Sequence, residues 1–258
     1  MVEVTPGAAM QRILLALQGG EDAAALEAAT ALAEGLRARL EGLFVEDADL
    51  LRLAALPFAT EIALSSAAAR PLKLAQLERQ LRAEAAAVRR LLETGATRRR
   101  LEYSFTVVRG RPASVVLALP SPADVFIFGR APSRHGEAHA LLNGPVLAVF
   151  DGTEGAARVL EVATALADRA GESVLVYVAV ETEADGTALE TALKRELVAL
   201  KAVVETLSPV PFDLDTLART VKARGISLLV LHHGHRLQEP ERLHQLLEAM
   251  PCPVILVR

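Results

Sequence analysis

The sequence is poor in cysteine and in aromatic residues. Among 258 residues there is one cysteine, Cys252, and no tryptophan. A single cysteine cannot form an internal disulfide, which excludes a disulfide-stapled fold and is typical of a reducing compartment. Aromatic residues make up 3% of the chain, whereas apolar residues, largely Ala and Leu, make up 52%. We therefore expect helices packed on a sheet through aliphatic side chains, with Cys252 buried among them.

The chain also lacks a basic excess and a long apolar run. Its formal net charge is -4 and its pI is near 5.9, so charge gives no reason to expect nucleic-acid binding. No apolar stretch approaches the roughly 20 residues that span a bilayer. Residues 1–10 lack the basic and apolar regions of a signal peptide. We expect a soluble, cytoplasmic protein that binds neither nucleic acid nor membrane.

One local basic run stands against this acidic balance. Arg98, Arg99 and Arg100 follow one another, and Arg89 and Arg90 precede them. The C-terminal end of a helix favours cations. We interpret the run as a solvated helix end and loop, with an anion site as the alternative.

What the sequence does contain is one pattern that occurs twice. Residues 12–45 and 145–178 each show an apolar run, a short polar turn, a helical stretch and a second apolar run. Inside the helical stretch the match is close to literal, LEAATALA at 26–33 against LEVATALA at 160–167. Such a match, with the flanking runs in step, indicates two homologous halves. We place the first domain at 11–143 and the second at 144–258.

Strands and helices are expected to alternate in both halves. Continuous apolar runs are typical of strands buried on both faces of a parallel sheet, and the amphipathic stretches between them supply crossover helices. The strands are expected at 13–17, 40–45, 101–108, 124–128, 145–150, 173–178, 209–215, 226–231 and 253–257. The helices are expected near 22–40, 71–93 (with Gly95 as a left-handed cap), 113–119, 155–170, 187–207, 216–224 and 239–250.

Two parts of the first half break this alternation. Residues 46–66 are apolar but interrupted by Pro57, and we interpret them as a short helix and a loop that cap the core. A partner surface or a lid over a cleft are the alternatives. Residues 129–143 hold at most one short helix, so the first half lacks its own fifth strand. Because exposed sheet edges are normally paired or covered, we expect the other half, a helix or a second molecule to cover this edge.

The order of motifs, repeated twice, resembles the universal stress protein family in its tandem, two-domain form. The likeness rests on Asp151-Gly152-Thr153 between a strand and an Ala-rich helix, on LFVED at 43–47, on ADVFIFG at 123–129, and on the ending PCPVILV at 251–257. It extends over about residues 12–258. It implies two tandem parallel-sheet α/β sandwiches, of the adenine nucleotide alpha hydrolase-like kind, with five strands per half. It also implies that two such units pair, often through the last strand.

The resemblance further implies an ATP site in some members, at the carboxyl edge of the sheet, where open α/β sheets generally hold ligands. The phosphate loop there reads Gly, two residues, Gly, nine residues, then Gly and Ser or Thr. Its glycines let backbone amides approach phosphate ahead of a helix N-terminus. In this sequence the later glycine places hold Pro132 and Leu142 counted from Gly129, and Leu237 and Leu247 counted from Gly234. Neither half keeps the loop, so we expect no cofactor.

A remnant of that site stays in the second half. Asp151-Gly152-Thr153 keeps the acid that, by the family pattern, touches the nucleotide, whereas Gln18 stands at the matching place in the first half. We interpret Asp151 as a turn and helix-cap residue, with a remnant nucleotide contact as the functional alternative. Together with Gly234, these three residues are the candidate cofactor-binding set, and ATP is the alternative cofactor.

Histidines gather at one strand end, as His232, His233 and His235. Alternation along a strand puts His232 and His233 on opposite faces, so these two do not converge on one metal. His135 and His139 would share a helix face, but we interpret them as part of a solvated loop. No Ser-His-Asp or Cys-His arrangement is suggested. We expect no metal, no catalytic residue and no enzymatic activity.

Taken together, these patterns predict a non-catalytic tandem universal stress protein that binds a protein partner or a small ligand. Its halves are expected to form an intramolecular pseudo-dimer. One alternative is an ATP-binding member that uses the second half. Another is a structural homodimer that presents the 46–70 insert.

Overall fold

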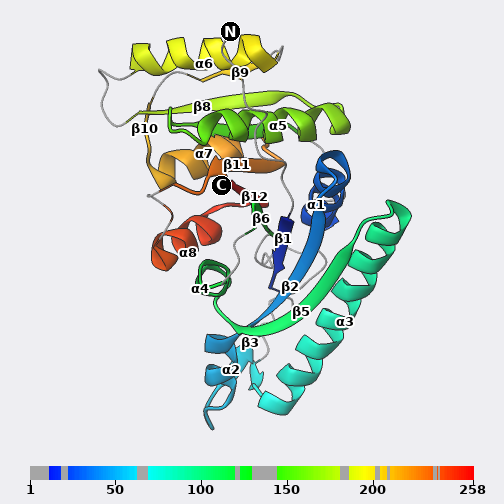
Figure 1. The fold of residues 1–258 in the computed structure, drawn as a ribbon. Coiled ribbons are helices and arrows are strands. Elements are labelled where there is room, and N and C mark those ends of the chain that lie inside the picture. The colour runs from blue at the N-terminus through cyan, green and yellow to red at the C-terminus, as the bar shows by residue number, and fades with distance from the viewer. Residues whose placement is uncertain are drawn as a thin grey trace.

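The computed structural model describes residues 12–18, 23–62, 69–119, 123–129, 144–180, 186–200, 204–207, 210–234, 237 and 239–258. Its centre is one ten-stranded sheet, and a separate two-stranded hairpin lies beside it. Helices cover both faces of the large sheet (Figure 1). The chain is therefore an α/β protein, as the alternating pattern predicts.

The elements follow one another along the chain as expected for two similar halves. Those of the first half are β1 (Arg12–Leu17), α1 (Ala23–Leu36), β2 (Arg39–Asp47), α2 (Ala48–Ala54), β3 (Thr60–Ile62), β4 (Ala69–Pro71), α3 (Leu74–Arg98), β5 (Tyr103–Gly110), α4 (Pro112–Leu117) and β6 (Val125–Phe128). Those of the second half are β7 (Val146–Phe150), α5 (Ala156–Ala170), β8 (Val174–Val180), α6 (Gly186–Leu200), β9 (Glu205–Thr206), β10 (Val210–Pro211), α7 (Leu214–Ala223), β11 (Leu228–His232), α8 (Pro240–Ala249) and β12 (Val254–Val257).

Both copies of the repeated pattern form the same β-α-β unit. β1 pairs in parallel with β2, and β7 pairs in parallel with β8. The connecting helices α1 and α5 lie against one another on the same face of the sheet. Their matched threonines make the same bond: Thr30 Oγ1 donates to the Leu26 carbonyl at 3.0 Å, and Thr164 Oγ1 donates to the Leu160 carbonyl at 2.8 Å.

The two halves meet at β12. The strands run β10-β8-β7-β11-β12-β6-β1-β2-β5 across the sheet, and β9 also pairs with β8. β12 is parallel to β11 but antiparallel to β6, so Ile255 lies between Val230 and Ile127. The edge of β6 is thus covered by a strand of the other half, which confirms the expectation for that edge. Both sides of β6 are occupied, and the first half adds no fifth strand there.

Two hydrophobic layers fill the space between the sheet and its helices. One layer lies under α1, α3, α5 and α6, and the other under α4, α7 and α8. Alternating side chains of β12 serve both layers, because Ile255 and Val257 face the first while Val254 and Leu256 face the second. None of the described helices is both long enough and apolar enough to cross a bilayer.

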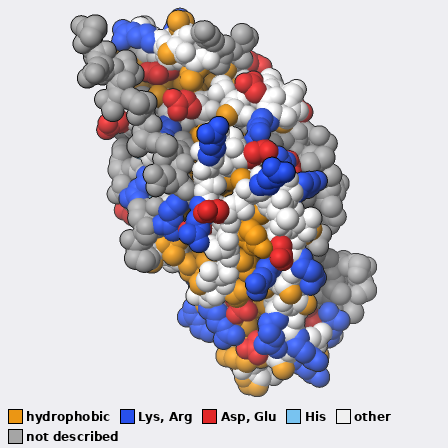
Figure 2. Space-filling model, turned by 45° about the vertical axis from the view of Figure 1, so that its right-hand side comes forward, with side chains coloured by type: hydrophobic (Ala, Val, Ile, Leu, Met, Phe, Trp, Pro, Cys, Tyr) orange, Lys and Arg blue, Asp and Glu red, His pale blue; other side chains and the backbone are white. Residues whose placement is uncertain are grey.

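The insert after β2 forms a small lobe at one end of the molecule, made of α2, the β3–β4 hairpin and the start of α3 (Figure 1). Asp47 caps α2, since its Oδ1 accepts from the Asp49 and Leu50 amides at 2.8 and 3.2 Å. The lobe has its own apolar cluster, formed by Leu51, Ala54, Leu77 and Leu81. Its outer side exposes large apolar side chains, namely Leu53, Leu56, Phe58 and Ile62. Figure 2 shows hydrophobic side chains at this end of the molecule among Lys and Arg.

Several elements differ from the sequence-based expectation. The strand expected at 209–215 is limited to β10, because Asp213 caps α7 and that helix begins at Leu214. α3 runs past Gly95 to Arg98, because Gly95 is buried against α1, where an added Cβ would lie 3.2 Å from Thr30 Cγ2. α6 ends at Leu200, and β9 pairs with β8 where more helix was expected. The 46–66 segment contains strand β3, which pairs with β4, where a loop was expected. The domain boundary between 143 and 144 stays a prediction.

Candidate functional site

The candidate residues of the second half lie at the carboxyl ends of β7 and β11, which are neighbouring parallel strands. Asp151 directly follows β7, and Gly234 lies just beyond β11. They help to line a small hollow, whose other walls are Val149, Phe212, Leu231, His232 and Leu237. This is the sheet edge at which open α/β folds bind ligands.

Asp151, Thr153 and His232 form a short hydrogen-bonded chain at this edge. The Thr153 amide and hydroxyl donate to Asp151 Oδ1 at 3.0 and 2.6 Å. The same hydroxyl oxygen lies 3.1 Å from His232 Nδ1. An ionised carboxylate can only accept, so the hydroxyl proton points at Asp151 and His232 Nδ1 donates to the hydroxyl. Asp151 is therefore a turn residue ahead of α5, and it orients the imidazole through Thr153. It does not cap the helix as expected, because the N-cap of α5 is Gly155, which has no side-chain cap.

Two glycines allow close packing around these three hydrogen-bonded residues. Gly152 has a φ of 70°, and a Cβ there would lie 2.2 Å from Leu189 Cδ2. A Cβ on Gly155 would lie 2.1 Å from His232 Cδ2. Gly155 immediately precedes α5, so the missing side chain lets the N-terminal end of that helix approach the imidazole.

The lining of the hollow is mostly apolar, because Val149, Phe212, Leu231 and Leu237 supply four of its seven described residues. Leu237, at the place of the second loop glycine, is 4% exposed and belongs to the core. Leu247, at the place of the third, lies inside α8 rather than ahead of a helix.

The corresponding edge of the first half keeps less of the pattern. Gln18 follows β1, as Asp151 follows β7. Gly129 follows β6, and its amide donates to the Ala16 carbonyl at 2.9 Å. The other predicted positions of this half, Pro132, Leu142, His135 and His139, lie outside the described residues, and so does His235 of the second half.

His232 and His233 point to opposite faces of the sheet, as alternation predicts. His232 lies on the α5 face beside Gly155, whereas the His233 ring lies 5.8 Å from that of Phe126 in the opposite layer. Burial, and then the positive charge of Arg258, lower the pKa of His233. Among the residues that the structure describes, no three His, Cys, Asp or Glu side chains converge as metal ligands would.

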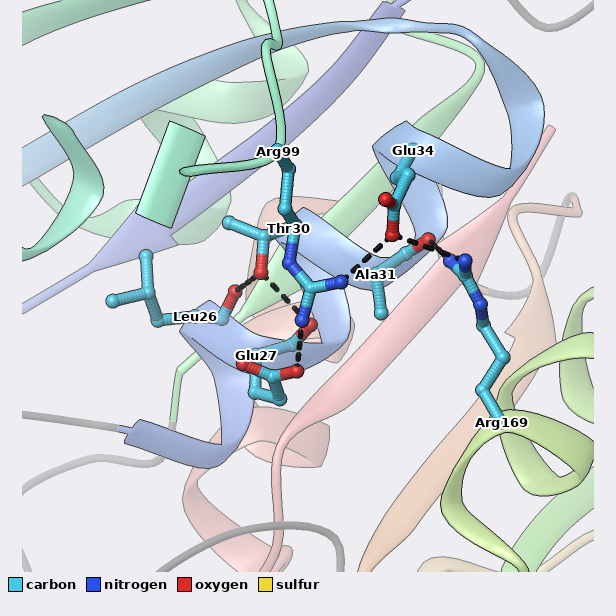
Figure 3. A network of polar contacts seen from close by, with 7 residues as sticks. All are labelled: Leu26, Glu27, Thr30, Ala31, Glu34, Arg99 and Arg169. Carbon is cyan, nitrogen blue, oxygen red and sulfur yellow. Dashed lines mark hydrogen bonds and ion pairs between the residues drawn. The ribbon is translucent and has the colours of Figure 1, made fainter. Parts of the chain in front are cut away.

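A polar network that the sequence did not indicate joins the two halves on the α1 face (Figure 3). Arg99, just beyond α3, donates to Glu34 at 2.7 Å and also binds Glu27, both on α1. Arg169 of α5 donates to Glu34 at 3.0 Å and to the Ala31 carbonyl. Arg99 is 22% exposed, so it is not the solvated helix end expected from the basic run. The other arginines of the run, Arg89, Arg90, Arg98 and Arg100, are exposed.

Removal of this guanidinium should weaken the fold. Arg99→Ala leaves Glu27 and Glu34 without their shared partner, and hydrogen bonds to charged groups contribute about 1.5–3 kcal/mol when partly buried. We expect a loss of about 1–2 kcal/mol in the free energy of unfolding, measured by urea denaturation. Arg98→Ala, an exposed neighbour, is the matched control and should change stability by less than about 0.5 kcal/mol. Equal losses in both variants would contradict the network.

The same network makes stability depend on acid. The hydrogen bond from Arg99 holds the pKa of Glu34 below its ordinary value of 4.5, and Arg169 adds to this. Because the folded pKa is the lower one, the stabilisation is present above 4.5 and is lost as the pH falls through the folded pKa. The stability difference between wild type and Arg99→Ala should therefore shrink on acidification. A difference that stays constant would count against Glu34 as the partner.

Comparison with known proteins identifies the fold. No protein-family model matches the sequence, and no curated protein is significantly similar to it. A universal stress protein from Archaeoglobus fulgidus DSM 4304 superposes with a TM-score of 0.52 at 11% identity, over 96% of this chain and 98% of that one. A functionally unknown protein from Pseudomonas aeruginosa PAO1 gives a TM-score of 0.49 at 15% identity, over 96% and 92%.

A shorter match is a universal stress protein in complex with cAMP, with a TM-score of 0.37 and 17% identity, over 45% of this chain and 96% of that one. At these identities the likeness concerns the fold. The chain has the universal stress protein fold along almost its whole length, which confirms the fold implied by the resemblance.

Proposed function

We propose that this chain, which has the universal stress protein fold, is a non-catalytic stress-response protein that binds a partner or a small ligand and has no working ATP loop. The observation that carries the proposal is the burial of Leu237. It occupies the place of a phosphate-loop glycine, and its side chain is part of the hydrophobic core beside the hollow.

The physical reason is the space and the donors that a triphosphate needs. A phosphate loop presents several backbone amides, and residues without a Cβ let the phosphate come close. Here Leu237 and Phe212 line the hollow, and the His232 ring lies against Gly155. The Leu237 amide is also engaged, since it donates to the Gly234 carbonyl at 3.0 Å.

The lobe supplies a surface better suited to a protein partner. Phe58 is 76% exposed and Ile62 is 65% exposed, which is unusual for side chains of this size. The lobe is also tied to the main body by charge, because Arg111, just beyond β5, donates to Asp49 of α2 at 2.6 Å and Arg109 of β5 donates to Glu78 of α3 at 3.3 Å. An apolar surface on a fixed support supports the partner-binding form of the proposal.

Titration with a fluorescent ATP analogue tests the lost phosphate site. We expect no saturable binding in the micromolar range, and no nucleotide among the small molecules carried through native purification. Saturable micromolar binding that unlabelled ATP reverses would overturn the proposal.

The alternative is an ATP-binding protein that uses the second half. It is favoured by one observation, the retention of Asp151 at the strand end beside Gly234 and the start of α5. Under this alternative Asp151→Ala abolishes nucleotide binding, whereas Asp168→Ala, an exposed aspartate later in α5, leaves it unchanged. Equal binding by the two variants would remove the alternative.

A further inference from the structure

The outermost strand of the large sheet, β5, is paired on one side only within the part of the chain that the structure describes. All eight of its residues pair with β2 on one side, from Tyr103 opposite Leu40 to Gly110 opposite Asp47. No strand of the described chain pairs with its other side. A free edge of this length is a template for pairing with another strand.

The register of β5 against β2 shows which backbone amides and carbonyls of β5 point toward the outer edge. The Leu40 amide donates to the Glu102 carbonyl at 2.9 Å, so the even-numbered residues of β5 turn their amides and carbonyls toward β2. Because direction alternates along a strand, the odd-numbered residues turn theirs outward. The outward residues are Tyr103, Phe105, Val107 and Arg109.

β5 lacks the features that normally protect an edge. Its sequence YSFTVVRG is rich in β-branched and aromatic residues and contains no Pro or Lys. Its single charge, Arg109, is held by Glu46 and Glu78. Val107 is 44% exposed. The opposite edge of the sheet differs, because β9 and β10 have two residues each and β10 ends in Pro211.

The last strand of the second half cannot serve another molecule. β12 is paired on both sides within the chain, by β11 and by β6. An extension of the sheet by a further strand must therefore use one of the two outer edges, and only β5 is long enough to support a regular ladder.

We propose that a second copy of this chain pairs its own β5 antiparallel to this edge, about a twofold axis that passes the sheet near Thr106. An axis perpendicular to the sheet places side chains that lie on the same face of the sheet in the two copies opposite one another. With the axis at Thr106, Phe105 lies opposite Val107 of the second copy, and Tyr103 lies opposite Arg109. All four outward residues of each copy then find outward partners.

The strand is complementary to itself in this register, which is why a second copy is the occupant. An aromatic side chain meets a β-branched one on one face, and two threonines meet on the other, pairs that stabilise antiparallel strands. The only charged side chain of β5 lies opposite a tyrosine and never opposite its own copy, so no like charges meet within the ladder. The dimer is independent of whether the hollow between β7 and β11 binds a ligand.

Light scattering after size exclusion tests the interface. The wild-type chain should have twice the 27.5 kDa mass of a single chain. Val107→Lys places a charge opposite Phe105 of the second copy and should raise the dissociation constant at least about tenfold, since edge lysines block strand pairing. Val198→Lys is the matched control, because Val198 is 79% exposed on α6, far from β5. A monomeric wild-type chain, or a Val107→Lys protein that stays a dimer, would overturn the proposal.

A cross-link tests the register with a variant that leaves the fold untouched. Thr106 is exposed, and it faces its own copy at the axis as a non-hydrogen-bonded pair with Cα atoms about 4.5 Å apart. Thr106→Cys should therefore form an intermolecular disulfide under mild oxidation. Ser104→Cys is the control, because the two copies of Ser104 would lie about 13 Å apart and could not be bridged. Absence of the Thr106 cross-link, or equal cross-linking by both variants, would contradict this pairing.

Discussion

The substitution Ile255→Ala is expected to lower the free energy of unfolding by about 2–5 kcal/mol, the usual cost of truncating a fully buried Ile. Ile255 is 0% exposed and lies in β12 between Val230 of one half and Ile127 of the other. A loss of this size is large beside the roughly 5–15 kcal/mol that stabilises a typical domain. Val198→Ala, at an exposed position, should cost less than about 0.5 kcal/mol.

The same variant should unfold in one transition, because β12 belongs to the ladders of both halves. The chain offers a reporter for each half, since its two tyrosines are Tyr103 in β5 and Tyr177 in β8. Tyr103→Phe leaves fluorescence from the second half, and Tyr177→Phe leaves fluorescence from the first. We expect coincident urea transitions in the two backgrounds, each shifted equally by Ile255→Ala. Transitions that separate, or a shift in only one background, would contradict the shared strand.

The substitution Gly144→Ala should be the second most damaging, at about 2–4 kcal/mol. Gly144 precedes β7 and has a φ of 140°, a region that residues with a Cβ rarely adopt. A Cβ there would also lie 2.6 Å from the backbone carbonyl oxygen of Gly225, and backbone cannot move aside as a side chain can. The Gly144 carbonyl itself accepts from Ser227 Oγ at 2.7 Å, which fixes this connection against the start of β11.

Gly171→Ala separates the cost of the positive φ from the cost of the Cβ contact with the Gly225 carbonyl oxygen. Gly171 ends α5 with a φ of 70°, and a Cβ there would meet nothing within 4 Å. It should therefore cost only the conformational penalty, about 1 kcal/mol. Thermal or urea denaturation of both variants gives the comparison. If Gly144→Ala cost no more than Gly171→Ala, the close contact with Gly225 would not be the cause.

The fold was predictable from sequence where one local signal determined it. The two apolar runs around each Ala-rich helix gave β1–α1–β2 and β7–α5–β8, because buried parallel strands need apolar residues on both faces. The missing strand after β6 predicted a covered edge, and β12 covers it. Which element would cover it could not be read, since pairing between distant strands depends on the whole arrangement.

The sequence-based predictions that were wrong concern residues whose roles depend on contacts between secondary-structure elements. Gly95 reads locally as a helix cap, but it is needed where α3 crosses α1. Arg99 reads as part of a solvated basic run, but Glu27 and Glu34 of α1 bind it. The β3 and β4 strands have three residues each, which is too short for an alternation of apolar and polar residues to reveal them.

The candidate site was only partly predictable. Strand ends and turn residues placed Asp151 and Gly234 at one edge from sequence alone, with Thr153 bonded to Asp151 there. The part played by His232 was missed, because its link to Thr153 joins residues that are distant in the chain. A glycine next to a helix start, Gly155, was the one local signal that a bulky ring lay close by.

The position of β12 also has a consequence for synthesis of the protein on the ribosome. β6 emerges long before β12, since the whole second half separates them in sequence. Until translation has passed Val257, β6, a strand of four buried apolar residues, is paired with β1 on one side and lacks its β12 partner on the other. Nascent chains in that state are prone to aggregate, so a premature stop codon anywhere in the second half should yield insoluble fragments, not a functional first domain.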